Sequence, residues 1–227
     1  MRTNEIHPTA VVDGDVVLGS GNVIGAYSVL EGPLTIGDDN WIGPHAVIGT
    51  RGDEIWQRRY DTSGKRVEIG SRCTIREHTT VHKPCYGEAT VLGDDVYLMP
   101  GSYAAHDTHL HDGAILAQNT AIGGVSQVLE KGYLAIGAVL HQHAVIGHYA
   151  IVGAAAAAVR CVRPFSRFVP GQPTTVNAYA IERHGFGELR EEIERWVLER
   201  IPPTSDRLAA MAAEYERLRD AGGRGEY

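Results

Sequence analysis

The chain has 227 residues and a formal charge of −7, with 43% hydrophobic and 22% charged residues, a composition typical of a globular protein. The net negative charge argues against a general nucleic-acid binder. No stretch of 18 apolar residues predicts a membrane span, and the first residues lack the pattern of a signal peptide, so we expect a cytoplasmic protein without an integral membrane segment. Three cysteines without a CxxC pair, Cys73, Cys85 and Cys161, indicate neither a disulfide framework nor a zinc knuckle, and we interpret them as packing thiols.

Aliphatic or small residues recur at every sixth position over two long runs, from Ile6 to Ile48 and from Leu92 to Ala158. One such hexad forms a short strand and a turn, and it cannot bury its single aliphatic side chain alone. Stacked coils of three hexads bury these side chains in columns. An antiparallel sandwich would alternate with period two, so we predict a mainly β protein built as a parallel β-helix of hexapeptide repeats.

A glycine often follows the inward-facing residue of a hexad, as in Ile24-Gly25 and Ile146-Gly147. A corner of the coil needs a residue with little bulk that tolerates positive φ, and glycine supplies both. We therefore expect these glycines to occupy the corners at positive φ.

The six-residue register breaks twice, because the hexads after Ile48 and Val81 resume at Ile69 and Leu92, and neither spacing is a multiple of six. This predicts loops at about residues 50–66 and 82–91. Insertions in solenoids tend to project on one side and to form binding surfaces.

The repeat pattern ends after Ala158. The proline-rich segment 163–173 is not expected to continue the stacked strands. We predict a β-helix over residues 1–173 and a helical region over residues 174–227.

Two amphipathic helices are expected in the C-terminal region. The first spans Gly187 to Arg200, and the second is capped by Ser205 and carries apolar residues at three- and four-residue spacing. Their apolar faces must be buried against another part of the protein or against a partner subunit. They form either a cap on the open end of the solenoid or a lid or subunit contact near a site, and the two roles are compatible.

Eleven histidines direct the search for chemistry. His106 is followed by Asp107, with His109 and His111 close behind. Zinc-dependent carbonic anhydrases are built on this type of solenoid, with two histidines about five residues apart and a third about two coils earlier. His106 and His111 have that spacing, but the window two coils earlier contains only Cys73. We therefore expect no metal site.

Three segments carry a clear family resemblance. They are the run Leu98–Asp107, the tripeptide Leu140–Gln142 and the segment Asn177–Phe186. Together they resemble the LpxA-type acyl-(acyl-carrier-protein)–UDP-N-acetylglucosamine O-acyltransferases, over most of the chain and without gaps from Leu92 to about Val152. The resemblance implies left-handed coils, an exception to the usual right-handed crossover. It also implies a homotrimer with active sites between subunits.

The resemblance further implies an enzyme that moves an acyl group from a thioester, acyl carrier protein or CoA, to a hydroxyl of a nucleotide-linked sugar, without another cofactor. It assigns His106 as the general base, a role that suits an imidazole with a pKa near 6.5, and Asp107 as the partner that fixes its tautomer. The backbone N–H of Gly124 would receive the charge of the oxyanion. A structural histidine at a corner is the alternative interpretation of His106.

The chain departs from the family around the acceptor sugar. An aspartate, a lysine and two histidines of the family correspond here to Gln57, Arg59, Tyr103 and Val125. Because lost hydrogen-bonding partners weaken recognition, we expect a nucleotide-linked sugar other than UDP-N-acetylglucosamine, or another small hydroxyl or amine acceptor. The remaining substrate-binding residues implied by the resemblance are His141, Gln142, Asn177, Arg183 and His184, the last of which replaces an arginine of the family.

The acyl groove is assigned by the same resemblance. Ala154 matches a family glycine near the far end of that groove, and Ile151 lies close to it in the sequence. Extra methyl groups there would shorten the acyl chain that is accepted. The alternative interpretation is that these alanines only pack between coils. Arg160, Arg163 and Arg167 would meet an acidic carrier protein or the phosphates of CoA, or are solvated surface residues.

Two other functions stay open at this point. One is a non-catalytic solenoid that binds a nucleotide sugar, and the other is N-acylation of an amino sugar. A free amine loses its proton only after attack, whereas a hydroxyl benefits more from a base, so the His-Asp pair favours oxygen. The identity of the sugar, the acyl group and the pathway are not indicated.

Overall fold

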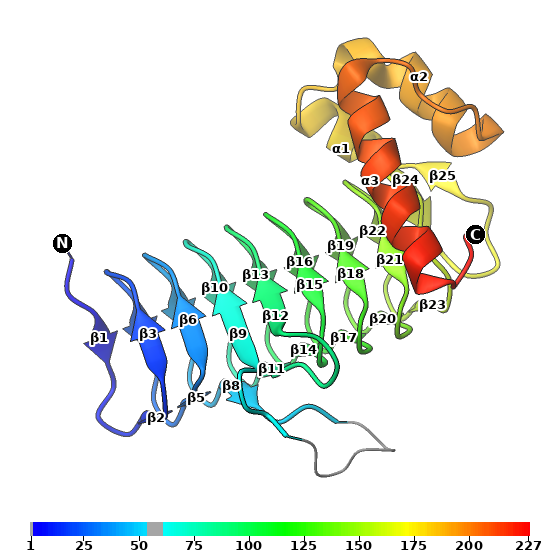
Figure 1. Ribbon diagram of the computed structural model, residues 1–227. Coiled ribbons are helices and arrows are strands. Elements are labelled where there is room, and N and C mark those ends of the chain that lie inside the picture. The colour runs from blue at the N-terminus through cyan, green and yellow to red at the C-terminus, as the bar shows by residue number, and fades with distance from the viewer. Residues whose placement is uncertain (1, 54–60) are drawn as a thin grey trace.

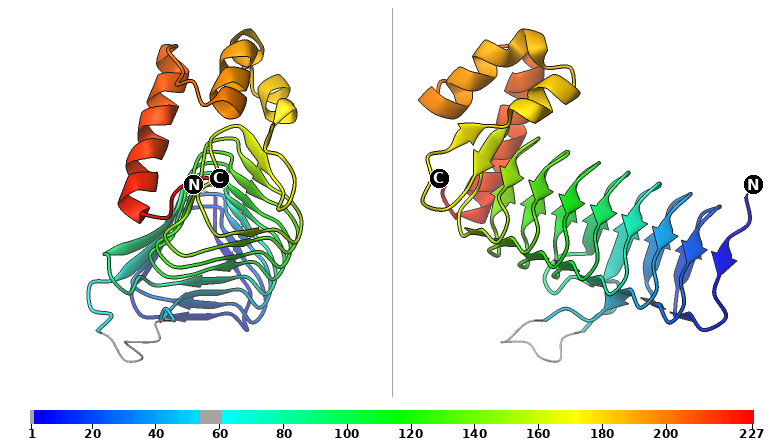
Figure 2. Two further views of the ribbon diagram at one scale, coloured as in Figure 1. Left: turned by 90° about the vertical axis from the view of Figure 1, so that its right-hand side faces the viewer. Right: turned by 180° about the vertical axis from the view of Figure 1, so that it is seen from behind.

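The computed structural model describes residues 2–53 and 61–227. Short strands, parallel except for one antiparallel pair at the C-terminal end, form three flat sheets around a triangular prism, with one strand per sheet in each regular coil (Figures 1 and 2). Paired residues such as Glu5 and Val23 are separated by three hexads, so three hexads make one coil. The coils are left-handed (Figure 2), and helices follow at the C-terminal end. The expected left-handed parallel β-helix is therefore confirmed.

The strands fall into sheets that we call A, B and C. Sheet A contains β1 (Glu5–Ile6), β4 (Val23–Ile24), β7 (Trp41–Ile42), β10 (Thr74–Ile75), β13 (Tyr97–Leu98), β16 (Ile115–Leu116), β19 (Tyr133–Leu134), β22 (Ile151–Val152), β24 (Ser166–Phe168) and β25 (Thr175–Val176). Sheet B contains β2 (Val11–Asp13), β5 (Val29–Glu31), β8 (Val47–Thr50), β11 (Thr80–His82), β14 (Tyr103–Ala104), β17 (Ala121–Ile122), β20 (Val139–Leu140) and β23 (Ala157–Ala158). Sheet C contains β3 (Val16–Leu18), β6 (Leu34–Ile36), β9 (Arg66–Ile69), β12 (Ala89–Leu92), β15 (His109–Leu110), β18 (Gln127–Val128) and β21 (Val145–Ile146).

The inward residues of successive coils stack into buried columns. Ile42, Ile75 and Leu98 in sheet A are fully buried, and the same holds for the equivalent residues of sheets B and C. The first coil differs, because Ile6 and Val12 are 45% and 42% exposed. No earlier coil in the described chain covers them, so two residues of the six-residue pattern contribute little to the core.

Most glycines that follow the inward residues have a different role from the one expected, although Gly49 does have a positive φ of 87°. Gly25 does not have positive φ; the left-handed conformation falls two positions later, on Tyr27, and recurs at His45 and Asp107. A Cβ built on Gly25 would lie 2.6 Å from the nitrogen of Pro44 in the next coil. Glycine is needed there because adjacent coils approach too closely for a side chain, and not because the corner turns at that residue.

The β-helix also continues beyond Ala158, where the repeat pattern stops. β24 pairs in parallel with β22, so that Val152 faces Phe168, a shorter step along the chain than the three hexads of a regular coil. The prediction that the proline-rich segment ends the stacking was wrong. Pro164 precedes β24 and Pro170 follows it, so neither interrupts a hydrogen-bonded strand.

The helical region is more segmented than expected. α1 (Ala178–Arg183) was not predicted, and the single helix expected over Gly187–Arg200 is a 3₁₀ turn η1 (Gly187–Leu189), a short α2 (Arg190–Glu194) and a π-helical turn η2 (Arg195–Glu199). α3 (Asp206–Gly222) matches the second expected helix. Ser205 takes the N-cap position, but its side chain makes no capping hydrogen bond within the part of the chain described.

The helices lie near the C-terminal end of the β-helix, with α1 and α2 above one edge of the prism and α3 along one side, against β21 (Figures 1 and 2). Tyr215 of α3 belongs to the core of the coils, whereas Phe186 and Trp196 form a second apolar cluster with Phe165 and Tyr149. Within the described residues, 2–53 and 61–227, no helix has the length and apolar character needed to cross a membrane.

Candidate active site

Residues expected to carry chemistry line one corner of the prism, between sheets B and C. His106, Gly124 and Gln142 occupy the same position in three successive coils, because each is separated from the next by one full coil of three hexads. The next residue in each coil, such as Asp107 and Val125, has positive φ of 59° and 62°. The backbone links the coils, since the N–H of Val125 donates to the carbonyl of His106 at 3.0 Å. We call this column of His106, Gly124 and Gln142 the His106 ladder.

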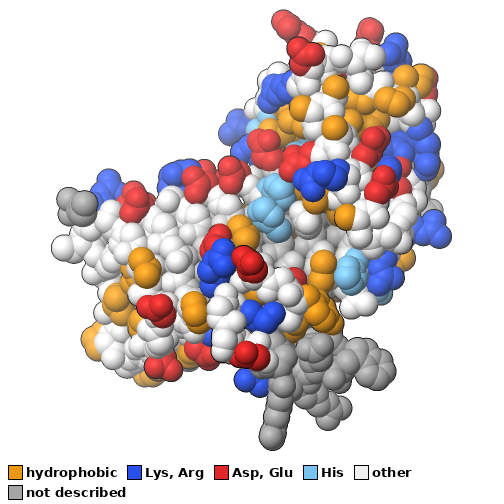
Figure 3. Space-filling view, in the orientation of Figure 1, with side chains coloured by type: hydrophobic (Ala, Val, Ile, Leu, Met, Phe, Trp, Pro, Cys, Tyr) orange, Lys and Arg blue, Asp and Glu red, His pale blue; other side chains and the backbone are white. Residues whose placement is uncertain are grey.

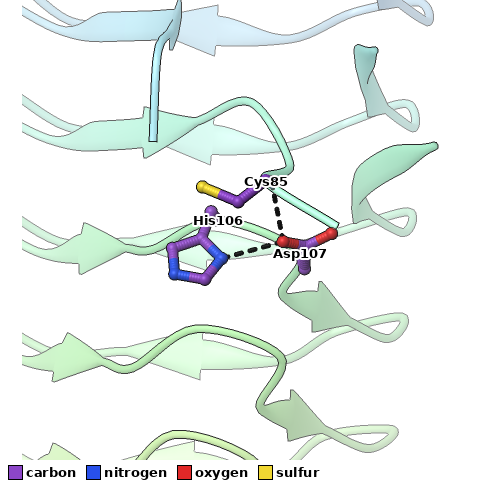
Figure 4. A group of neighbouring side chains, drawn as sticks. All are labelled: Cys85, His106 and Asp107. Atoms are coloured by element: carbon purple, nitrogen blue, oxygen red, sulfur yellow. Dashed lines mark hydrogen bonds and ion pairs between the residues drawn. The ribbon is translucent and has the colours of Figure 1, made fainter. Parts of the chain in front are cut away.

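His106 and Asp107 form a hydrogen-bonded pair on this ladder (Figure 4). Nδ1 of His106 lies 2.8 Å from Oδ2 of Asp107, and the two side chains are only 9% and 7% exposed. The left-handed backbone at Asp107 turns its carboxylate back toward the preceding ring. With the hydrogen on Nδ1, Nε2 carries the lone pair and can accept a proton.

The second loop fixes the carboxylate of Asp107. The backbone N–H groups of Cys85, Tyr86 and Gly87 all donate to its oxygens, at 2.8, 3.1 and 2.6 Å. Burial by itself would raise the pKa of Asp107, but the hydrogen bonds from His106 and from this loop outweigh it and lower the pKa. The group is therefore held as an anion that orients the imidazole.

Gly124 lies directly against the imidazole in the next coil. A Cβ built on it would collide with the Cε1 and Nε2 atoms of His106, so no other residue fits without moving the ring. Its carbonyl accepts from His143, while its own N–H donates to no group of the described chain. A backbone donor without an acceptor, on a residue that contacts the imidazole, suits the stabilisation of negative charge.

Tyr103 also points to this corner. Its hydroxyl lies 3.3 Å from a carboxylate oxygen of Asp53 and 3.3 Å from Nδ1 of His82. Burial raises the pKa of Tyr103 and lowers the pKa of His82, so both are neutral near pH 7. Gln57 and Arg59 lie outside the described residues.

Cys85, His106 and Asp107 could in principle hold a metal, since one ligand atom from each lies within 4.8 Å of the others (Figure 4). The oxygens of Asp107 already accept three backbone N–H groups and face His106. A metal would have to break these bonds, so the donor set fits a hydrogen-bonded pair better. Cys73 and Cys161 are buried, as packing thiols are.

A second group of candidate residues surrounds a cavity of about 430 Å³ at another corner, between sheets C and A. Ile151, Asn177 and His184 line it. Asn177 caps α1, accepting from Ala180 N–H at 3.4 Å, and its Nδ2 donates to the carbonyl of Tyr149 at 2.8 Å. Both polar atoms of Asn177 thus hold α1 over the cavity. Burial lowers the pKa of His184.

Two of the remaining candidates, Arg183 and Ala154, are not brought into either group. Arg183 is exposed on α1 and does not line the cavity that takes His184. Ala154 is exposed at the corner between sheets A and B, away from Ile151 on the sheet A face. Gln142 is the exposed third residue of the His106 ladder, His141 is exposed next to it, and the carbonyl of Gln142 accepts from Nε of Arg224 at 3.0 Å.

Lys131 lines the same cavity and was missed by the sequence reasoning. The register already contained the signal, because Gly113, Lys131 and Tyr149 are spaced by one full coil each and so fall on one corner. Cys85 and Gly87 were also missed. They act through backbone N–H groups, which leave no side-chain pattern in the sequence.

Comparison with known proteins gives consistent relatives, although no protein-family model matches the chain. An O-acyltransferase of Alkalilimnicola ehrlichii is 34% identical over 150 residues, which cover 63% of this chain and 58% of the relative. One from Burkholderia thailandensis is 31% identical over 186 residues, 80% of this chain and 70% of the relative. Both are named acyl-(acyl-carrier-protein)–UDP-N-acetylglucosamine O-acyltransferase. The chain therefore spans between about half and about two thirds of these relatives.

Solved structures share the fold. The structure of LpxA, a UDP-N-acetylglucosamine acyltransferase from Bacteroides fragilis, superposes with a TM-score of 0.73 at 21% identity and covers 99% of this chain and 98% of that one. The left-handed β-helix, together with the named relatives, places the protein in the class of hexapeptide-repeat acyltransferases. Within that class, the chain belongs to the family of LpxA-type UDP-N-acetylglucosamine O-acyltransferases.

Proposed function

We propose that this protein transfers an acyl group from a thioester carrier to a hydroxyl of a nucleotide-linked sugar, with His106 as the general base. The observation that carries the proposal is the buried bond between His106 and Asp107, which leaves Nε2 as a proton acceptor close to the backbone of Gly124. The relatives, which are named for this kind of transfer from acyl carrier protein, support it.

The proposed reaction needs only these groups. Nε2 of His106 takes the proton of the acceptor hydroxyl as its oxygen attacks the thioester carbonyl. The N–H of Gly124 donates to the oxyanion that forms. The carbon–sulfur bond then breaks, the sulfur takes the proton from His106, and an ester and a free thiol result. Asp107 stabilises the imidazolium between these steps.

His106→Ala tests this mechanism. General bases contribute about 10²–10⁴-fold to rate, so we expect a loss of that size in acyl transfer to the preferred acceptor. Unchanged nucleotide-sugar binding, measured by calorimetry, serves as the control for folding. An unchanged transfer rate would contradict the enzyme assignment and leave the alternative of a non-catalytic solenoid that binds a nucleotide sugar.

The proposed acceptor differs from UDP-N-acetylglucosamine. Val125 presents an apolar side chain where the family has a histidine, and the hydroxyl of Tyr103 is already bonded to Asp53 and His82. A thermal-shift panel of nucleotide sugars tests this, because binding to the native state raises stability. Strong stabilisation by UDP-N-acetylglucosamine, relative to the other sugars, would refute it. Analysis of the acyl-transfer products formed from the same nucleotide sugars distinguishes an ester from an amide and so tests O- against N-acylation.

We further propose that the active site forms between subunits of a homotrimer. In one chain the His106 ladder and the cavity with Asn177 and His184 occupy different corners of the prism, so a single coil stack does not bring them to one ligand. Corners of neighbouring chains would have to meet. Analytical ultracentrifugation tests the trimer, and a monomer with full activity would contradict it.

The acyl chain accepted is proposed to be short, because Ala154 replaces the family glycine. Ala154→Gly is expected to shift the preference toward longer acyl donors, read from a series of acyl carrier protein and CoA thioesters. The same series identifies the carrier. An unchanged preference would assign Ala154 to packing only.

A further inference from the structure

The cavity between sheets C and A contains a lysine side chain with unusual surroundings. Gly113, Lys131 and Tyr149 stand above one another in successive coils, each with positive φ. A Cβ built on Gly113 would lie 3.1 Å from both Cγ and Nζ of Lys131. The lysine therefore folds across the bare backbone of Gly113, and the missing side chain there gives it room at the cavity wall.

The charge of Lys131 is not balanced at the cavity. Among residues 2–53 and 61–227 it makes no ion pair, and none of the residues that line the cavity is acidic. The neighbouring Glu130 accepts a hydrogen bond from Tyr149 Oη at 2.8 Å. After burial, the charges of Lys131 and Arg183 lower the pKa of His184, and the charge of Glu130 opposes them. Lys131 and His184 both line the cavity, so they face the same space. Such a site attracts an anion.

The walls favour a flat, partly apolar group next to that anion. Tyr133, Tyr149 and Tyr179 line the cavity, together with Ile115 and Ile151. Aromatic rings bind planar ligands through their faces and edges. A planar ring joined to phosphate is the chemistry of a nucleotide. The nucleotide could be the carrier of an acceptor sugar or the adenosine phosphate of coenzyme A.

We propose that Lys131 binds a phosphate of a nucleoside diphosphate in this cavity and so selects a diphosphate-linked acceptor over an unphosphorylated one. The proposal rests on the proposed function for the presence of a nucleotide. It adds a specificity-determining residue outside the segments that resemble the family's nucleotide site.

Isothermal titration calorimetry on the full chain tests it, with UDP, uridine and coenzyme A as probes and no acyl transfer required. Removing a charged hydrogen-bond partner costs about 1.5–3 kcal/mol, so Lys131→Met is expected to weaken UDP binding about 10- to 100-fold. Uridine and coenzyme A binding should be unchanged. Lys131→Arg should restore UDP affinity to within about threefold, because it keeps the charge.

Arg217→Met is the matched control, because it removes one positive charge from an exposed position on α3 and should leave UDP binding unchanged. Unchanged UDP affinity in Lys131→Met, or no UDP binding by the unaltered protein, overturns the proposal. An equal loss for uridine would assign Lys131 to packing, and a loss for coenzyme A alone would place the phosphate on the donor; both also overturn it. Because no thioester is present, these results are independent of whether His106 is the base.

Discussion

Nδ1 of His106 lies 2.8 Å from Oδ2 of Asp107, although the two residues are adjacent in the chain. Neighbouring side chains of an extended strand point to opposite faces, so this bond requires the left-handed backbone at Asp107, where φ is 59°. The same carboxylate gathers three N–H groups from the loop between β11 and β12. One residue thus orients the proposed base and holds the loop beside it.

Asp107→Asn is expected to reduce acyl transfer about 10²-fold or more, because the amide can hold His106 in the wrong tautomer. The amide can still accept some of the N–H bonds, so the variant should fold. Steady-state kinetics measures the effect, with circular dichroism as the check on folding. Activity within about twofold of the unaltered protein would show that the carboxylate does not orient the base.

Gly124→Ala should impair catalysis more than stability. The added methyl group would overlap the ring of His106, and displacement of a catalytic group by about 1 Å can cost about 10²-fold in rate. Gly187→Ala is the matched control, because a Cβ there meets nothing within 4 Å. Equal activity of the two variants would contradict a close contact between Gly124 and the imidazole.

Gly25→Ala tests the role of glycine in coil stacking. Its Cβ would lie 2.6 Å from the backbone nitrogen of Pro44, which cannot move aside like a flexible side chain. Overpacking of this kind costs about 1–3 kcal/mol, so the free energy of unfolding should fall by that amount. Chemical denaturation measures it. A variant as stable as Gly187→Ala would show that the coils can separate without cost.

His148 should make the protein sensitive to acid. Histidine side chains gather with charged residues where the helices meet the coils (Figure 3). Burial lowers the pKa of His148 to about 4, although the carboxylate of Glu214 on α3, 3.2 Å away, opposes the shift. The unfolded chain binds this proton below about pH 6.5 and the folded chain only near pH 4, so stability falls as the pH falls through that range.

Since one unit of pKa corresponds to about 1.4 kcal/mol, His148 alone is expected to remove about 2–3 kcal/mol of stability between pH 7 and pH 4. Thermal unfolding across this range should show a smaller decline in His148→Gln than in the unaltered protein. His7→Gln changes an exposed histidine of the first coil and is the control. An identical decline in all three proteins would mean that His148 is not the acid-sensitive group.

Much of the fold could be predicted because a six-residue period follows directly from the geometry of the coil. The period set His106, Gly124, Val125 and Gln142 at defined positions of their coils. The cavity was not predicted as a unit. Its lining residues come from four coils and from α1, and no sequence window contains them together. The division of the chain at residue 173 stays a prediction.

The predictions that were wrong rested on the local backbone preferences of single residues, and the packing of the coils and helices overrode these preferences. Positive φ was expected at the glycines after inward residues, yet apart from Gly49 that conformation falls on residues such as Tyr27 and Val125. Prolines around β24 were expected to end the sheet, yet they stand outside the strand. The helix expected over Gly187–Arg200 is divided into segments of different pitch, the last of which, η2, packs against β25.

The sequence by itself determined the repeating scaffold and the order of chemical groups along it, because each hexad must bury one aliphatic residue and the period then sets every corner. Only the tertiary structure decided which groups meet. The contacts of Asp107 with the loop and of Gly124 with the His106 ring depend on close stacking of backbones that are distant in the chain. Likewise, Lys131 faces His184 because α1 folds back over the coils.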